Sequence, residues 1–184
     1  ICEAAWERRV NMTDADVKKY VISVMYLADW GYLSVKNPQT ITKDMFVESL
    51  KKIGIEKGDV LLVHSGLSYM GHITGGAEAV LDALIEAVGE EGTVIFPTLV
   101  QKDFGNAYKN WNKETTPSDV GYLTEYFRKV PGAKRSDQAT HSVAAIGKLA
   151  DYITETHGQS GLRHGPFGET PFAADSPWEK MYKL

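Results

Sequence analysis

Histidine and small hydroxyl side chains fall at the predicted ends of strands. His64 and Ser65 directly follow the short apolar run of residues 60–63, while His141 and Ser142 stand at the beginning of another apolar run. An imidazole can give or take a proton near neutral pH, and backbone N–H groups in a small polar loop can bind phosphate or a negatively charged oxygen. These residue types therefore indicate acid–base or anion-binding chemistry. For each histidine, the alternative is a cap or a buried, hydrogen-bonded ring with a structural role.

Common signatures of other chemistries are missing from the sequence. There is no G-x-G-x-x-G, the glycine-rich stretch 71–77 lacks the lysine of a P-loop, and residues 63–66 lack the first glycine of a nucleophile elbow. The five histidines do not show H-E-x-x-H or another tight ligand spacing. We therefore predict neither a serine hydrolase nor a metal site.

The composition indicates an ordinary globular protein. The chain has 184 residues, of which 43% are hydrophobic and 24% charged, which favours one domain with an appendage at most. A net charge of -4 argues against a nucleic-acid partner and is compatible with a cationic substrate. A single cysteine, Cys2, rules out an internal disulfide, so we expect a cytoplasmic protein. No apolar run approaches the length that spans a bilayer, so no membrane partner is expected.

Residues 1–39 are predicted to form a helical appendage. Thr13 and Asp16 match a capping box, and apolar residues recur at helical spacing as far as Trp30. We interpret this helix as lying on the domain or on a second subunit of a homo-oligomer. Because the sequence begins with Ile1 and not with methionine, we expect it to start inside a longer reading frame.

From residue 40 onwards, helical and extended patterns alternate, which predicts an α/β fold. We expect a mostly parallel sheet flanked by helices in three layers, because long crossover segments separate the strands. In an open α/β sheet, ligands bind just past the carboxyl ends of strands, so residues 64–68 are the first candidate site. The predicted strands are 60–63, 93–96 and 142–146, and the predicted helices are 42–53, 75–88, 118–130 and 149–153, with loops at 99–116 and 157–177 and the start of another element at 178.

Several sequence blocks occur in one order between residues 41 and 184, and together they resemble the aminoglycoside 3-N-acetyltransferase family. This family has the antibiotic acetyltransferase fold, which is not the GNAT fold. The blocks are GDVLLVHSGLS (58–68), GTVIFPT (92–98), TPSDVG (116–121), RS (135–136), THSVAAIG (140–147), TPF (170–172) and SPWEK (176–180).

The chain departs from the family pattern at two places. Family members usually carry His-Pro where this chain has Gln138-Ala139, and Ser-Ser where it has Ser65-Gly66. The family also continues past the position of Leu184 into an H-x-x-E helix, which carries the expected catalytic pair. We therefore expect the chain to be a fragment or a truncated relative.

The resemblance implies transfer of an acetyl group from acetyl-CoA to an amine of an aminoglycoside antibiotic, as in a resistance enzyme. His64, and after it His141, would support a main base that lies beyond Leu184. Backbone N–H groups would stabilise negative charge on the thioester oxygen. The residues expected to contact coenzyme A are Ser65, Gly66, Leu67, Ser68, Arg135, Ser142 and Val143, and those expected to face the sugar are Asp103 and Trp111.

Alternatives remain open at this stage. A protein with the same fold could acylate another amine, because one fold hosts different substrates. A non-catalytic module that binds coenzyme A or a partner protein would also fit. For Arg135, taken without the resemblance, a solvated surface charge is the default.

Overall fold

The computed structural model describes residues 40–102, 105–157 and 171–184. The predicted appendage at residues 1–39 lies outside the described residues. The elements are α4 (Lys43–Lys52), β1 (Val60–Leu62), η1 (Leu67–Tyr69), α5 (Gly76–Val88), β2 (Thr93–Pro97), η2 (Ala107–Lys109), α6 (Tyr122–Phe127), β3 (Lys134–Arg135), β4 (Val143–Gly147), α7 (Ala150–Thr154) and α8 (Pro177–Lys183).

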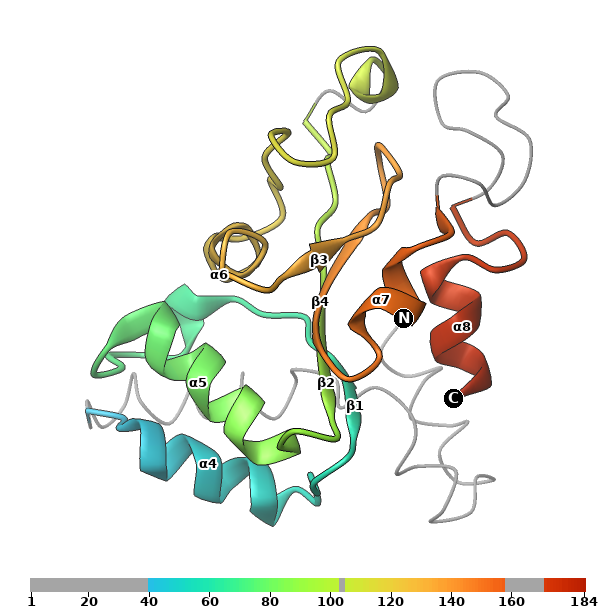
Figure 1. The fold of residues 1–184 in the computed structure, drawn as a ribbon. Coiled ribbons are helices and arrows are strands. Elements are labelled where there is room, and N and C mark those ends of the chain that lie inside the picture. Colours follow the sequence, from blue (N-terminus) through green and yellow to red (C-terminus); the bar gives the residue numbers. More distant parts are fainter. Residues whose placement is uncertain (1–39, 103–104, 158–170) are drawn as a thin grey trace, which may run out of the picture.

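One sheet of four strands runs through the described part of the chain, in the order β1-β2-β4-β3 (Figure 1). β1 and β2 are parallel, whereas β4 runs antiparallel to both of its neighbours. The α/β class is confirmed, but the expectation of a mostly parallel sheet is corrected to a mixed one. The sequence prediction missed β3, and the connection from β3 to β4, residues 136–142, is too short for the dozen or so residues of a parallel crossover.

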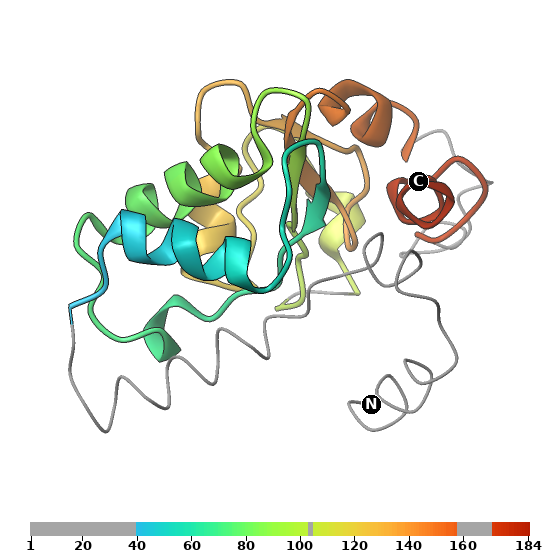
Figure 2. The ribbon, with the colours of Figure 1, turned by 90° about the horizontal axis from the view of Figure 1, so that it is seen from below.

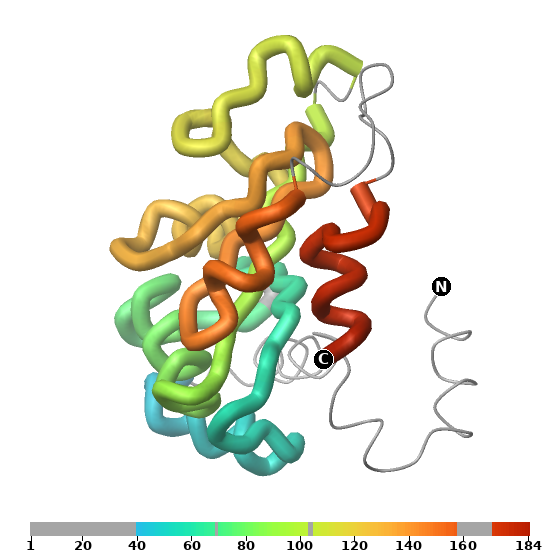
Figure 3. The backbone as a smooth tube through the Cα atoms, turned by 45° about the vertical axis from the view of Figure 1, so that its right-hand side comes forward, coloured from blue at the N-terminus to red at the C-terminus, as the bar shows by residue number. Residues whose placement is uncertain are grey.

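Helices cover both faces of the sheet, which confirms the three-layer arrangement (Figure 2). Successive side chains of a strand point to opposite faces. Along β2, Val94 and Phe96 belong to the core under α4, α5 and α6, while Ile95 belongs to a smaller core under α7 and α8. Figure 3 shows α8 in red beside α7 in orange on this second face.

The two longest helices form where the sequence predicts them, for local reasons. The Thr42 hydroxyl caps α4 by accepting a hydrogen bond from the Met45 amide at 3.3 Å. Gly89 ends α5 at a φ of 66°, in the left-handed region that glycine adopts readily. Both helices bury an apolar face in the main core, and Phe46 and Val80 are each 1% exposed. Burying side chains of this size contributes about 1.5–3 kcal/mol each.

α6 is shorter than the predicted helix at residues 118–130. Its sequence neighbours on the N-terminal side bind the preceding loop instead of extending the helix. Ser118 Oγ donates to the carbonyl of Leu99 at 3.0 Å, and the Asp119 carboxylate accepts from the Gln101 amide at 2.9 Å. Side chains that bond neighbouring backbone groups in this way compete with helix formation.

We predict that Gly147→Ala destabilises the fold by about 2–4 kcal/mol. Gly147 has a φ of +124°, and a Cβ atom there would lie 2.2 Å from the Gly92 carbonyl oxygen. Urea denaturation measures the loss. Gly132→Ala is the matched control, because Gly132 has a φ of +88° with no atom within 4 Å of its Cβ position, so it carries the backbone cost alone. Equal losses in the two variants would contradict the steric argument.

Candidate functional site

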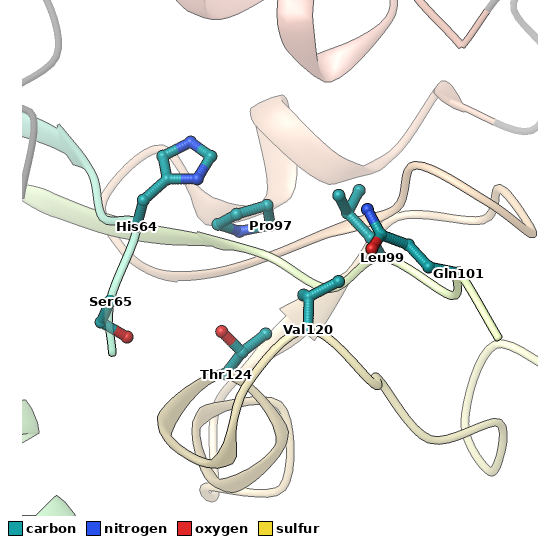
Figure 4. Close-up of a pocket in the computed structure, with 7 residues that line it drawn as sticks. All are labelled: His64, Ser65, Pro97, Leu99, Gln101, Val120 and Thr124. Atoms are coloured by element: carbon teal, nitrogen blue, oxygen red, sulfur yellow. The ribbon is translucent and has the colours of Figure 1, made fainter. Parts of the chain in front are cut away.

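A pocket of about 300 Å³ lies where β1 and β2 end, beside the beginning of α6 (Figure 4). We call it the strand-end pocket. Its position agrees with the expectation that ligands bind past the carboxyl ends of the parallel strands. The residues that line it are His64, Ser65, Pro97, Leu99, Gln101, Val120 and Thr124.

His64 stands at the mouth of this pocket. The residue as a whole is exposed, yet burial of part of the ring lowers its pKa from the ordinary value of 6.5. The imidazole is therefore mostly neutral at pH 7, and a neutral imidazole can both donate and accept a hydrogen bond. The structure thus places a proton-exchanging group where the sequence predicted one.

Of the predicted loop 64–68, only His64 and Ser65 line the pocket. Ser65 Oγ is buried without a hydrogen-bond partner among the described residues. An unpaired buried hydroxyl costs about 1–3 kcal/mol, so this atom marks a place that favours a polar ligand group. Leu67 begins η1 and packs against the main core, and Ser68 is exposed.

Arg135 is buried, being only 6% exposed. The three guanidinium nitrogens donate to oxygens of the chain. The Cζ atom of Arg135 lies 4.5 Å from the centre of the Trp111 ring. Burial, followed by repulsion from Arg128, lowers the pKa of Arg135 to about 10, so it stays charged at neutral pH. The acceptors are Thr98 O, Thr98 Oγ1, Ser142 Oγ, Lys113 O and Thr116 O.

This arrangement places Arg135 in a structural network and not on a surface open to a phosphate. A buried charge is tolerated only when its hydrogen bonds are satisfied, and this one is satisfied by the protein itself. The expectation that Arg135 is a solvated surface charge is wrong, since its side chain is enclosed. Nothing in its position supports the expected contact with coenzyme A.

Ser142 lies at the same end of the sheet as the strand-end pocket but does not line it. Its hydroxyl donates to the Thr98 carbonyl at 2.9 Å, and the residue is fully buried. The Val143 amide donates to Ser136 Oγ at 2.9 Å, so it is already used by the protein. Neither residue lines the pocket.

His141 does not line the strand-end pocket. Its ring makes an edge contact with Phe172 at 5.3 Å between centroids, and its backbone carbonyl accepts from Trp178 Nε1 at 3.1 Å. Burial lowers its pKa. The structure therefore brings His64 and Ser65 together in one pocket and leaves His141 outside it.

The segment between β2 and α6 projects past the ends of the strands (Figure 1). Trp111 Nε1 donates to the Asp137 carboxylate at 2.7 Å, which ties the segment to the connection between β3 and β4. Asp119 binds the amides of Gln101 and Lys102, which fixes the part that lines the pocket. Asp103, predicted to face the sugar, lies outside the described residues.

The sequence interpretation missed several pocket residues. Gln101 lies in the loop predicted at 99–116 and Val120 in the helix predicted at 118–130, and neither position by itself indicates a pocket. Thr124 carried no signal, because a single threonine in a predicted amphipathic helix is ordinary. The block at 116–121 indicates the family resemblance but does not by itself predict a pocket.

Two further findings concern only the described residues. Within 40–102, 105–157 and 171–184, no three His, Cys, Asp or Glu side chains gather in a way that could hold a metal ion. In that same part of the chain, every helix is too short or too polar to cross a membrane.

We predict that Arg135→Lys lowers the free energy of unfolding by about 3 kcal/mol, because a lysine cannot reproduce the forked contacts of a guanidinium and leaves buried acceptors unpaired. Urea denaturation measures the change. Lys134→Met is the control: its ion pair with Asp151 is exposed, and such pairs contribute at most about 1 kcal/mol. A loss for Arg135→Lys no larger than the control would show that the network is not needed.

We predict a pH-dependent contribution from Glu125, which accepts hydrogen bonds from the Ser118 amide and from Arg128. Burial alone raises the pKa of Glu125, but the hydrogen bonds from Arg128, Lys129 and Ser118 outweigh it and lower the pKa to about 2. A lowered folded-state pKa gives stability that is present above the unfolded value of 4.5 and lost as the pH falls towards about 2.

Glu125→Gln should therefore cost about 2 kcal/mol near pH 7 and progressively less below about pH 4.5, measured by urea denaturation across this range. Glu48→Gln on the exposed face of α4 is the matched control, and it should change the free energy of unfolding by about 0.5 kcal/mol at most. A deficit of Glu125→Gln that stays constant with pH would refute the linkage.

Comparison with known sequences places this fold and pocket in a family. The family model described as aminoglycoside 3-N-acetyltransferase matches residues 62–184. The SPbeta prophage-derived aminoglycoside N(3')-acetyltransferase-like protein YokD of Bacillus subtilis (strain 168) is 37% identical over 137 residues, with 63% of this chain and 50% of that protein covered. Aminoglycoside N(3)-acetyltransferase III of Salmonella sp is 33% identical over 132 residues, with 63% and 46% covered.

Solved structures agree with the sequence comparison. The crystal structure of YokD matches with a TM-score of 0.59 and 33% identity, over 68% of this chain and 59% of that one. AAC-IIIb in its binary complex with CoASH matches with a TM-score of 0.67, 79% of this chain and 57% of that one, and at 21% identity it shows the fold alone. The chain spans about half the length of the curated relatives it matches. Because the family model covers most of the described sheet and its helices, the chain belongs to the aminoglycoside 3-N-acetyltransferase family.

Proposed function

We propose that the chain is part of an enzyme that transfers an acetyl group from acetyl-CoA to an amine of an aminoglycoside. The observation that carries the proposal is the family match over residues 62–184, whose sheet holds the strand-end pocket. A relative of the same fold, AAC-IIIb, has been solved with CoASH, which supports coenzyme A as the donor.

The chemistry of the strand-end pocket fits the pantetheine arm of coenzyme A. Its lining combines apolar surface from Pro97, Leu99 and Val120 with polar groups that carry no fixed charge. A slender chain with amides and methylenes matches such a lining. A polycationic sugar matches it poorly, because an ammonium that loses its water needs a carboxylate nearby. At about 300 Å³ the pocket stands at the small end of ligand sites, so it suits an arm and not the whole of coenzyme A.

When bound, acetyl-CoA supplies an activated acyl group. An amine attacks such a group only in its neutral form, so a nearby proton acceptor assists. We assign His64 a supporting role at the mouth of the pocket, where its lowered pKa keeps it neutral and able to orient a base or polarise the thioester. The backbone amides of Ser65 and Gly66 are the proposed donors to negative charge on the thioester oxygen.

We place the aminoglycoside on the projecting segment between β2 and α6. Exposed or half-exposed carboxylates, those of Glu114 and Asp137, belong to this segment or contact it and would attract a cationic sugar. Trp111 and Asp103 remain our proposed contacts. Transfer to a different amine is the second possibility on the same fold.

The setting of the reaction is also part of the proposal. We propose a cytoplasmic enzyme, since a chain with one cysteine has no disulfide within itself that needs an oxidising compartment. A homo-oligomer, and the expectation that nucleic acid and membranes are not partners, stay predictions.

We predict that the full-length protein binds acetyl-CoA in a calorimetric titration and releases free CoA thiol when an aminoglycoside is added. His64→Ala should lower the rate about 10- to 100-fold, the effect of losing one strong hydrogen bond to a charged or reacting group. Because the pKa of His64 is below 6.5, its contribution should disappear as the pH falls through that lowered value.

His72→Ala is the matched control, because His72 is an exposed histidine that does not line the pocket. It should behave as the unaltered protein does. A folded protein that binds no coenzyme A would refute the donor, and binding without acetylation across a panel of aminoglycosides would refute the acceptor.

A further inference from the structure

Two hydroxyls face each other across the inner part of the strand-end pocket. Figure 4 shows the side chains of Ser65 and Thr124 turned towards one another, one from the end of β1 and the other from the first turn of α6. A Cβ atom placed on Gly121 would lie 3.5 Å from the Ser65 carbonyl oxygen and 3.8 Å from Thr124 Oγ1, so both residues lie close around this glycine. The loop after β1 and the first turn of α6 therefore meet here, although Ser65 and Thr124 are 59 positions apart in the sequence.

The fold leaves the hydroxyl of Ser65 without a partner among the described residues and turns the hydroxyl of Thr124 towards it. Ser65 Oγ is buried and has no hydrogen-bond partner among the described residues, which means that it does not bond Thr124 either. Thr124 is 3% exposed and lines the pocket. A threonine so deeply placed in a helix would pack equally well as valine if only its shape mattered. The pair therefore has the character of a binding site and not of a packing contact.

The charges around the pair decide which ligand group it suits. Glu125, the carboxylate next in sequence to Thr124, is engaged with Ser118, Arg128 and Lys129. Among the described residues, no ionised side chain lines the pocket, so a phosphate or an ammonium would lose hydration there without a countercharge. A neutral group that offers one donor and one acceptor remains. Each hydroxyl can donate and accept, so two of them match the N–H and C=O of a secondary amide.

We propose that Ser65 and Thr124 together bind one amide of the pantetheine arm of coenzyme A. This inference rests on the proposed function, because it assumes that coenzyme A is the donor. It adds a ligand contact from α6, an element to which the sequence assigned no role in binding. It also explains why Gly121 adjoins the pair: a side chain there would enter the space between β1 and α6, at a φ of +152° that disfavours any other residue.

The test compares two ligands and three variants by calorimetry on the purified protein. Coenzyme A contains the arm, while adenosine 3′,5′-bisphosphate is its nucleotide half without the arm. Thr124→Val and Ser65→Ala should each weaken coenzyme A binding about 5- to 10-fold, the effect of one hydrogen bond, and leave the nucleotide half unchanged. Thr124→Ser keeps the hydroxyl and should bind as the unaltered protein does.

Thr154→Val is the matched control for the loss of a hydroxyl from a helix. Its Oγ1 donates to the Ala150 carbonyl within α7, on the opposite face of the sheet, and it should leave both ligands unaffected. Thermal unfolding establishes that each variant is folded.

The outcomes separate this inference from the proposed function. Unchanged coenzyme A binding by folded Thr124→Val and Ser65→Ala would overturn the inference and leave the donor proposal standing. Equal weakening of both ligands would also overturn it, because the effect would not belong to the arm. A folded, unaltered protein that binds neither ligand would remove the donor proposal and the inference together.

Discussion

The burial of one charged group, the guanidinium of Arg135, constrains the end of the sheet where the site lies. Its five hydrogen-bond acceptors come from the end of β2, the start of β4 and the segment before α6. A buried cation is stable only if all of these acceptors are in place, so the end of the sheet must close around it as one unit. Trp111 completes this closure by stacking on the guanidinium and bonding Asp137. The projecting segment is thereby held against the strand ends, and Leu99 and Gln101 become a fixed wall of the pocket.

The direction of β4 is the second constraint, and it follows from connectivity. A parallel β4 would start at the far end of the sheet and carry Ser142 away from β1. Because β4 instead follows β3 through a short connection, it begins where β2 ends, and Thr98 and Ser142 meet with their hydroxyl oxygens 2.9 Å apart. Alternation along the strand then divides the chemistry between two faces. Ser142 joins Arg135 on the α6 side, while His141 packs with Phe172 and Trp178 on the α8 side.

The site that results joins two environments with different electrostatics. In the described part of the chain, the strand-end pocket is lined by neutral groups, so it suits a neutral arm, and burial lowers the pKa of the His64 imidazole at its mouth. Charged groups are kept outside it by pairing: Glu125 holds Arg128, and Asp119 holds backbone amides.

Elements with local signals could be predicted from the sequence. The cap at Thr42, the apolar stripe of α5 and the buried runs of β1 and β2 predicted those elements because periodicity and capping act within a few residues. The sequence also located His64 and Ser65 at a strand end, and its ordered blocks identified the family. Three features could not be predicted from the sequence and became evident in the folded chain: the direction of β4, the burial of Arg135 and the proximity of Ser65 to Thr124. Each of these features depends on contacts between segments that are distant in the sequence. Such contacts cannot be inferred from the spacing or the chemistry of neighbouring residues.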